Sequence, residues 1–148
     1  MTSRLNAYWP RLAGLFLLGV IGFAAHAGEE GESPPSVEGA TTIDIPEAQR
    51  LHAAGVKFID VRNPRLFARR HVPGAIHLNL TDDFNLANLS ATVGKDEPFV
   101  IYCSGITCSR SSDAAAWAVE WGFSQVKYFR EGMAGWRDAG LPMVTSDD

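Results

Sequence analysis

The sequence has few cysteines: among its 148 residues only Cys103 and Cys108 occur, five positions apart. A disulfide between them would close a very short loop, and a bridge of that kind stabilises a fold little because it removes little entropy from the unfolded chain. We therefore expect the pair to serve a chemical purpose rather than to staple the fold.

The chain also lacks an excess of positive charge, with 13 Lys and Arg against 17 Asp and Glu and a net charge of −4. An acidic protein repels other polyanions, so we expect neither a nucleic acid nor an anionic membrane surface as a partner. No internal repeat is visible, and the length suits one domain with its own core.

No apolar run is long enough to cross a membrane. The longest, residues 12–25, is shorter than the ~20 residues that a spanning helix needs. It follows Arg4 and Arg11 and ends in Ala25-His26-Ala27, which has the small-x-small pattern of a cleavage site. This order predicts a secretory signal peptide over residues 1–27. We expect an exported protein, periplasmic or secreted, without stable membrane association after cleavage.

Residues 28–40 are acidic, rich in Gly and Pro and poor in large apolar side chains, which predicts a flexible linker. The pattern changes at Thr41, and we assign a single domain to residues 41–144. Because an exported protein meets an oxidising environment, Cys103 and Cys108 are expected to spend time as a disulfide.

Within this domain, short apolar segments alternate with helical patterns. Residues 99–102 form a continuous apolar run, typical of a strand buried on both faces of a parallel sheet. Asp44 followed by Glu47 predicts a capping box at a helix start. We expect strands over 41–43, 56–61, 75–80, 99–102 and 126–129, and helices over 44–54, 64–69, 82–93, 111–121 and 134–139. This alternation predicts an α/β domain with a central, mainly parallel five-stranded sheet flanked by helices.

Cys103 directly follows the apolar run 99–102, at the carboxyl end of a strand, where such sheets place their ligand sites. The next residues are small enough to turn backbone N–H groups inward as an anion-binding nest: Ser104, Gly105, Ile106 and Thr107. Because a helix begins after this loop, we expect Cys103 to be a thiolate nucleophile at neutral pH. Arg110 adds a fixed positive charge.

Two other interpretations of the loop remain open from the residues alone. Cys103 can be a thiol buried for packing, with Cys108 an incidental neighbour. A zinc site would need both cysteines and two of His52, His71 and His77, and no pair among them has the usual close ligand spacing. We therefore predict no metal.

Three segments resemble one known family, the rhodanese-like domain. They are FIDVRNPRLFARRHVPGAIHLNL (58–80), FVIYCSGITCSRSSDAA (99–115) and YFREGMAGWRDAGLPM (128–143), in the family's order. The resemblance implies a sulfurtransferase in which Cys103 takes sulfur from a small anionic donor such as thiosulfate and passes it to a thiol acceptor. It also implies that the amides of 104–108 hold the donor, that Arg110 assists, and that no cofactor is needed.

The same resemblance implies that Asp60 and Arg62 brace the fold. Turn chemistry in His71-Val72-Pro73-Gly74 favours a structural role for His71, in shaping a turn, over a catalytic one. The chain departs from the family pattern in its loop, where Gly105 is the second residue after the nucleophile and Cys108 is the fifth.

Cys108 therefore allows a second function, a thiol–disulfide oxidoreductase or redox sensor that works with a redox partner protein. A phosphatase of similar fold would need five residues between Cys103 and Arg110, and here there are six. A non-catalytic binding module is disfavoured by the intact thiol.

Overall fold

A computed structural model describes residues 31–145, so the predicted signal peptide lies outside the described residues. The strands are β1 (Thr41–Thr42), β2 (Lys57–Asp60), β3 (Arg70–His71), β4 (Ile76–His77), β5 (Phe99–Tyr102), β6 (Val126–Phe129) and β7 (Val144–Thr145). The helices are α1 (Ile45–Ala53), α2 (Pro64–Arg69), α3 (Leu86–Thr92), α4 (Arg110–Glu120) and α5 (Gly132–Asp138).

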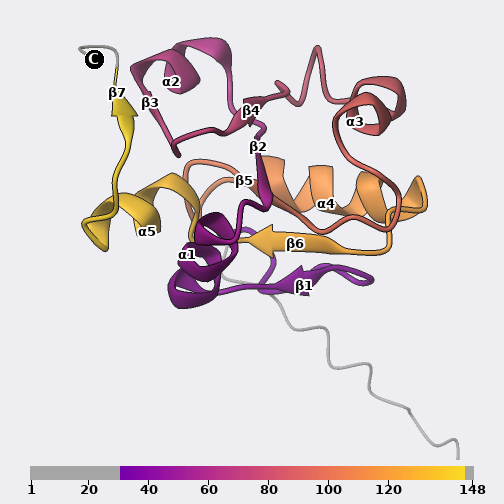
Figure 1. Ribbon diagram of the computed structural model, residues 1–148, viewed down its shortest axis with the longest axis horizontal. Helices are drawn as coiled ribbons and strands as arrows, with labels where there is room; N and C mark the ends of the chain where they lie inside the picture. The colour runs from indigo at the N-terminus through magenta and orange to yellow at the C-terminus, as the bar shows by residue number, and fades with distance from the viewer. Residues whose placement is uncertain (1–30, 146–148) are drawn as a thin grey trace, which may run out of the picture.

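Five strands form one parallel sheet in the order β1-β6-β5-β2-β4. Strand β5 lies at its centre, paired with β2 on one side and β6 on the other (Figure 1). All four residues of β5 are buried, as its continuous apolar sequence predicts. The α/β fold with a five-stranded parallel sheet is therefore confirmed.

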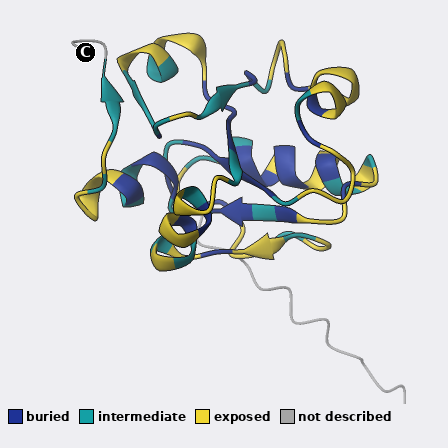
Figure 2. Cartoon of the chain, viewed as in Figure 1, coloured by how far each residue is buried: buried dark blue, intermediate teal, exposed yellow. Residues whose placement is uncertain are grey.

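Helices cover both faces of this sheet, and each face has its own core. Ile59, Ile101 and Tyr128 belong to the core that packs against α3 and α4, where Ala114, Ala115 and Ala118 let α4 approach closely. Phe58, Val100 and Phe129 point to the opposite core, which includes residues of α1 and α5. Figure 2 shows the buried sheet-facing sides of these helices and their exposed outer sides.

The prediction for residues 75–80 differs from the structure, because only Ile76–His77 form a strand. The chain turns at Asn79, whose carbonyl accepts hydrogen bonds from the amides of residues 82–84. A second, antiparallel pair, β3 with β7, was not predicted. Asp44 caps α1 as expected, but the Glu47 carboxylate binds Arg50 instead of completing a capping box.

The expected flexible linker over 28–40 also differs from the structure in its described part. Ser33 is buried, and its neighbours contact the end of β6. Arg130 and Tyr128 supply donors to the carbonyls of Ser33 and Pro34, which the acidic, Gly- and Pro-rich composition does not reveal.

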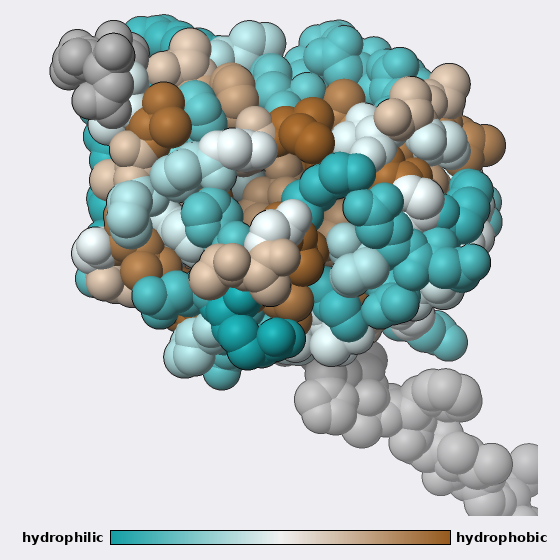
Figure 3. Space-filling model, in the orientation of Figure 1, coloured by the Kyte–Doolittle hydropathy of each residue, from teal (hydrophilic) through white to brown (hydrophobic). Residues whose placement is uncertain are grey.

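Figure 3 shows a face that is mostly hydrophilic, with hydrophobic residues in small separate groups. Among the helices of residues 31–145, none is long and apolar enough to cross a membrane.

Candidate functional site

The candidate site is the loop between β5 and α4, residues 103–109, at the carboxyl end of the central strand. Cys103 directly follows Tyr102 of β5 and is 1% exposed. Its sulfur forms a disulfide with Cys108, across Cα atoms 6.3 Å apart. The structure therefore shows the oxidised loop, in which neither cysteine is a nucleophile until the bridge is reduced.

The beginning of α5 holds the first half of this loop. The Met133 N–H donates to the Cys103 carbonyl and the Ala134 N–H to the Ser104 carbonyl, each at 2.9 Å. Gly132 makes the approach possible, because a Cβ there would overlap the Cys103 carbonyl. Its φ of +56° also favours glycine.

The next two carbonyls are held from other directions. The Cys108 N–H donates to the Gly105 carbonyl at 3.0 Å and closes a turn inside the loop. The Ile106 carbonyl accepts from the Ser33 N–H at 2.6 Å and from Ser33 Oγ at 2.8 Å. Four successive carbonyls, from Cys103 to Ile106, therefore have fixed directions.

The amides of residues 104–107 have the opposite property. In the described part of the chain, none of these four N–H groups donates to a protein acceptor. Each shares a peptide plane with one of the four fixed carbonyls, and in a trans peptide the N–H points away from the C=O. In the described part of the chain the loop thus has four consecutive N–H groups without a protein acceptor, and anion binding by Ser104 to Thr107 stays a prediction.

Arg110 is the first residue of α4, and its side chain braces the strand ends. Its Nε donates to the Val61 carbonyl at 2.9 Å and its Nη2 to Asn79 Oδ1 at 2.5 Å. These bonds fix the start of α4 relative to β2. The direct catalytic assistance expected of Arg110 stays a prediction, and the observed contacts are structural.

A cavity of about 240 Å³ borders the loop at Ser104. Arg69, Arg70 and Arg137 contribute to its lining. Arg69 and Arg70 form no ion pair within residues 31–145, whereas Arg137 pairs with Asp138. This basic rim was not predicted, although adjacent arginines in an acidic chain are a usable signal.

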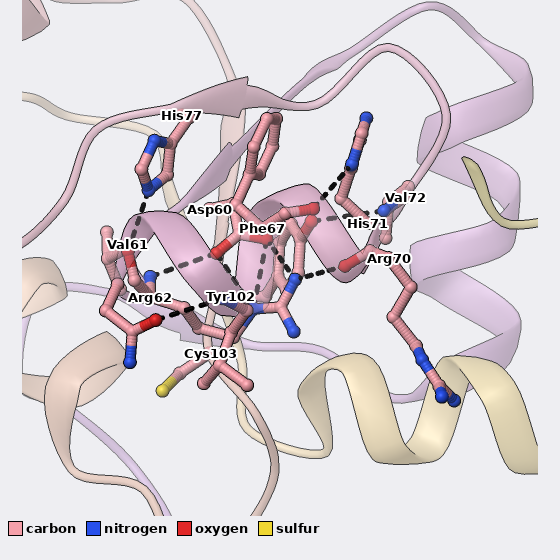
Figure 4. A network of polar contacts seen from close by, with 12 residues as sticks. Asp60, Val61, Arg62, Phe67, Arg70, His71, Val72, His77, Tyr102 and Cys103 are labelled. Carbon is pink, nitrogen blue, oxygen red and sulfur yellow. Dashed lines mark hydrogen bonds and ion pairs between the residues drawn. The ribbon is translucent and has the colours of Figure 1, made fainter. Parts of the chain in front are cut away.

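Beside the loop, Asp60 and Arg62 form a buried network (Figure 4). Arg62 Nη2 lies 2.6 Å from Asp60 Oδ2 and also donates to the Arg70 carbonyl at 2.7 Å. Burial, reinforced by the charge of Asp60, raises the pKa of Tyr102 well above its ordinary value. Figure 4 shows Cys103 at the edge of this network with its sulfur directed away from Arg70. The network supports the β2 and β5 strand ends.

The three histidines of the domain all contact backbone carbonyls. His52 Nε2 is bonded to the Pro73 carbonyl, His71 Nδ1 to that of Phe67 and His77 Nε2 to that of Arg62. Within residues 31–145, no group of three or more His, Cys, Asp or Glu side chains is placed to hold a metal ion.

Known proteins similar to this chain share its domain. A model of the rhodanese-like domain matches residues 47–139. The thiosulfate sulfurtransferase GlpE of Pseudomonas syringae pv. syringae is 35% identical over 91 residues, which cover 62% of this chain and 81% of that enzyme.

A longer relative is an HTH-type transcriptional regulator of Mycobacterium tuberculosis, 32% identical over 135 residues. The match covers 89% of this chain but only 58% of the regulator. Among solved structures, a Rhodopseudomonas palustris protein described as a possible tyrosine phosphatase is 29% identical with a TM-score of 0.60. That match covers 71% of this chain and 85% of the other.

Proposed function

This chain belongs to the rhodanese-like domain family, and from that premise we propose that it is a sulfurtransferase that works through a persulfide on Cys103. The observation that carries the proposal is a set of four amides, at residues 104–107, that have no acceptor among residues 31–145 and directly follow a cysteine at a strand end. Donors of this kind suit a small dianion such as thiosulfate.

The first half-reaction begins once the Cys103–Cys108 disulfide has been reduced. The Cys103 thiolate attacks the outer sulfur of thiosulfate, a sulfur–sulfur bond forms, and sulfite leaves with the electron pair of the broken bond. The amides of 104–107 hold the donor's charge, and the start of α4 favours the thiolate. No general base is needed, because the nucleophile is already ionised.

In the second half-reaction, a thiophilic acceptor attacks the outer sulfur of the persulfide. Cyanide leaves as thiocyanate and a thiolate leaves as a persulfide, and the Cys103 thiolate is restored in both cases. The two half-reactions give ping-pong kinetics.

The basic rim supports recognition of an anionic donor. Arg69, Arg70 and Arg137 line a cavity that touches Ser104, in a chain whose net charge is negative. A local concentration of positive charge attracts anions and raises their rate of arrival. This attraction weakens as salt is added.

A thiol–disulfide oxidoreductase or redox sensor is the second candidate, and the Cys103–Cys108 disulfide favours it. In that reaction a partner dithiol reduces the bridge, two electrons and two protons pass to the loop, and the partner becomes a disulfide.

We also propose export with cleavage after Ala27, which predicts Gly28 as the N-terminus of the protein isolated from its native cell.

The deciding experiment is intact-mass analysis of the reduced, desalted Cys108→Ser protein after incubation with thiosulfate, because this variant lacks the thiol that lies beside Cys103. We expect a gain of one sulfur atom on Cys103, reversed by cyanide with release of thiocyanate. Wild-type protein left in the disulfide form is the matched control and should gain nothing. If reduced Cys108→Ser gains no sulfur from thiosulfate but the wild-type disulfide exchanges rapidly with a dithiol, the redox function replaces the sulfurtransferase.

A further inference from the structure

Ser33, far from the loop in sequence, contacts the loop at Ile106, beyond the two carbonyls that α5 holds. The residue is 3% exposed, and its N–H and Oγ both donate to the Ile106 carbonyl, at 2.6 and 2.8 Å. Resting on the function proposed above, we propose that Ser33 is a positioning residue of the anion-binding loop. By fixing the Ile106 carbonyl, Ser33 keeps the Thr107 N–H directed at the bound sulfur donor.

Ser33 is itself held in place by the end of β6. Arg130 donates to the Ser33 carbonyl from Nε at 3.0 Å and from Nη2 at 2.8 Å, and it pairs with Glu32 at 2.8 Å. The Tyr128 hydroxyl donates to the Pro34 carbonyl at 3.0 Å. The Ser33 backbone is therefore held in place before it contacts Ile106, and a residue that positions another must itself be held in this way.

The peptide between Ile106 and Thr107 depends on this contact more than its neighbours depend on theirs. The carbonyls of Cys103 and Ser104 are held by amides of α5, and that of Gly105 is held within the loop itself. Both Ile106 and Thr107 have exposed side chains, so packing does not fix the plane between them. Within residues 31–145, Ser33 supplies the hydrogen bonds to the Ile106 carbonyl.

Rotation of the peptide between Ile106 and Thr107 would replace an attraction between the Thr107 N–H and the bound anion with a repulsion between the anion and a carbonyl oxygen. With the Ile106 carbonyl held by Ser33, the Thr107 N–H lies on the other side of the peptide plane and is free to bind an anion. If the plane turns over, a carbonyl oxygen takes the place of that N–H and faces the anion. The loss of one hydrogen bond to a charged group weakens donor binding by roughly tenfold.

Ser33 lies outside residues 47–139, which match the family model. A segment that precedes the matched domain thus completes the loop on which the proposed reaction depends. The composition of residues 28–40 predicts only a linker, so this role emerges from the contacts alone.

The test uses two substitutions and one matched control, all made in a Cys108→Ser background so that a single thiol reacts. Ser33→Ala removes the Oγ bond and keeps the N–H, whereas Ser33→Pro removes both donors. Thr42→Val is the control, because Thr42 Oγ1 donates to the Pro35 carbonyl at 3.1 Å and secures the same segment without contacting the loop.

Three quantities are measured: persulfide formation against thiosulfate concentration, discharge of the formed persulfide by cyanide, and the urea midpoint. For Ser33→Pro we expect the thiosulfate concentration at half-maximal rate to rise roughly tenfold, with a smaller rise for Ser33→Ala. Discharge by cyanide should change little, and Thr42→Val should behave like its parent. The proposal would be overturned by Ser33 variants that form the persulfide at the parent's rate. It would also be overturned by variants that lose persulfide formation, discharge by cyanide and stability together.

A fourth measurement separates this proposal from the proposed function. Iodoacetamide alkylates the Cys103 thiolate, so the pH dependence of alkylation reports how well the loop amides stabilise that thiolate when no sulfur donor is present. If the Cys108→Ser parent forms no persulfide with thiosulfate, the proposed function fails, and the alkylation measurement alone then tests whether Ser33 positions the loop. A rise in the midpoint pH of alkylation in Ser33→Pro, absent from Thr42→Val, supports the positioning role, and an unchanged midpoint overturns it.

Discussion

Arg62 and Asp60 form a buried ion pair beside the candidate loop, with Nη2 and Oδ2 2.6 Å apart and side chains 4% and 0% exposed. The Arg62 backbone N–H donates to the same carboxylate at 2.9 Å. Because Asp60 is the last residue of β2 and Arg62 lies two residues further on, the pair fixes the place where that strand leads into α2. It is a structural pair, as the family resemblance implies.

Removal of Arg62 should therefore destabilise the protein strongly. Arg62→Ala leaves the Asp60 carboxylate buried without its cation, and we expect a loss of about 3–5 kcal/mol in the free energy of unfolding. Urea denaturation measures it. Arg50→Ala is the control, because the Arg50–Glu47 pair is exposed and its loss should matter little. Similar losses in both variants would contradict a structural role for the buried pair.

Substitution of Gly132 should disturb the loop from the α5 side. Gly132→Ala places a Cβ against the Cys103 carbonyl and 3.1 Å from the Gly105 nitrogen, at a φ of +56°. We expect backbone strain to lower the free energy of unfolding by about 1–3 kcal/mol, as measured by urea denaturation. We also expect slower persulfide formation on Cys103, as measured by stopped-flow mixing with thiosulfate. Gly122→Ala is the matched control, since its φ is +87° and nothing lies within 4 Å of the new Cβ. Equal effects of the two substitutions on persulfide formation would show that the close contact between Gly132 and the Cys103 carbonyl has no role in the reaction.

The raised pKa of Tyr102 predicts a loss of stability at alkaline pH. The phenol ionises near pH 10 in the unfolded chain and above that in the fold, because burial and the charge of Asp60 disfavour the phenolate. The stabilisation is therefore fully present below pH 10 and falls above it, by at most about 1.4 kcal/mol per pH unit.

Tyr102→Phe tests this, because it removes the ionising group and keeps the ring. Urea midpoints measured between neutral pH and about pH 11 should fall more steeply for the wild type than for the variant above pH 10, the ordinary tyrosine pKa. At neutral pH the variant should be less stable, since the Val72 N–H loses the phenol oxygen that accepts from it at 3.2 Å. Parallel pH profiles would show that Tyr102 is not the responsible group.

The sequence predicts those features of this protein that depend on local patterns. The apolar run 99–102 identifies the central strand, and the small residues after Cys103 identify the loop whose amides have no acceptor in the described part of the protein. The β3–β7 pair escapes prediction because each strand has two residues and their partners lie more than seventy positions apart. The contact between Ser33 and Ile106 escapes for the same reason: a single long-range hydrogen-bond acceptor leaves no periodic trace in the sequence.

The roles of the two cysteines give the sharpest prediction. The disulfide shows that the sulfurs of Cys103 and Cys108 reach one another within the folded loop. A persulfide on Cys103 therefore has a thiol beside it. Attack by Cys108 on the inner sulfur forms the Cys103–Cys108 disulfide and releases the outer sulfur as hydrosulfide. Because this step is intramolecular, it competes with transfer to an external acceptor.

Cys108→Ser should consequently form the persulfide on Cys103 and keep it, with a lifetime at least roughly tenfold longer than in the wild type, given the high effective concentration of a neighbouring thiol. The wild type should release one hydrosulfide for each disulfide that it forms. Cys103→Ser is the matched control of the same size, and it should take no sulfur from thiosulfate. Intact-mass time courses with a parallel sulfide assay measure all three proteins. Turnover that survives Cys103→Ser but not Cys108→Ser would invert the assignment. Transfer that survives both, with disulfide exchange lost in both, would identify the loop as a redox switch, because a thiol pair without a sulfur-transfer role still exchanges electrons with a partner dithiol.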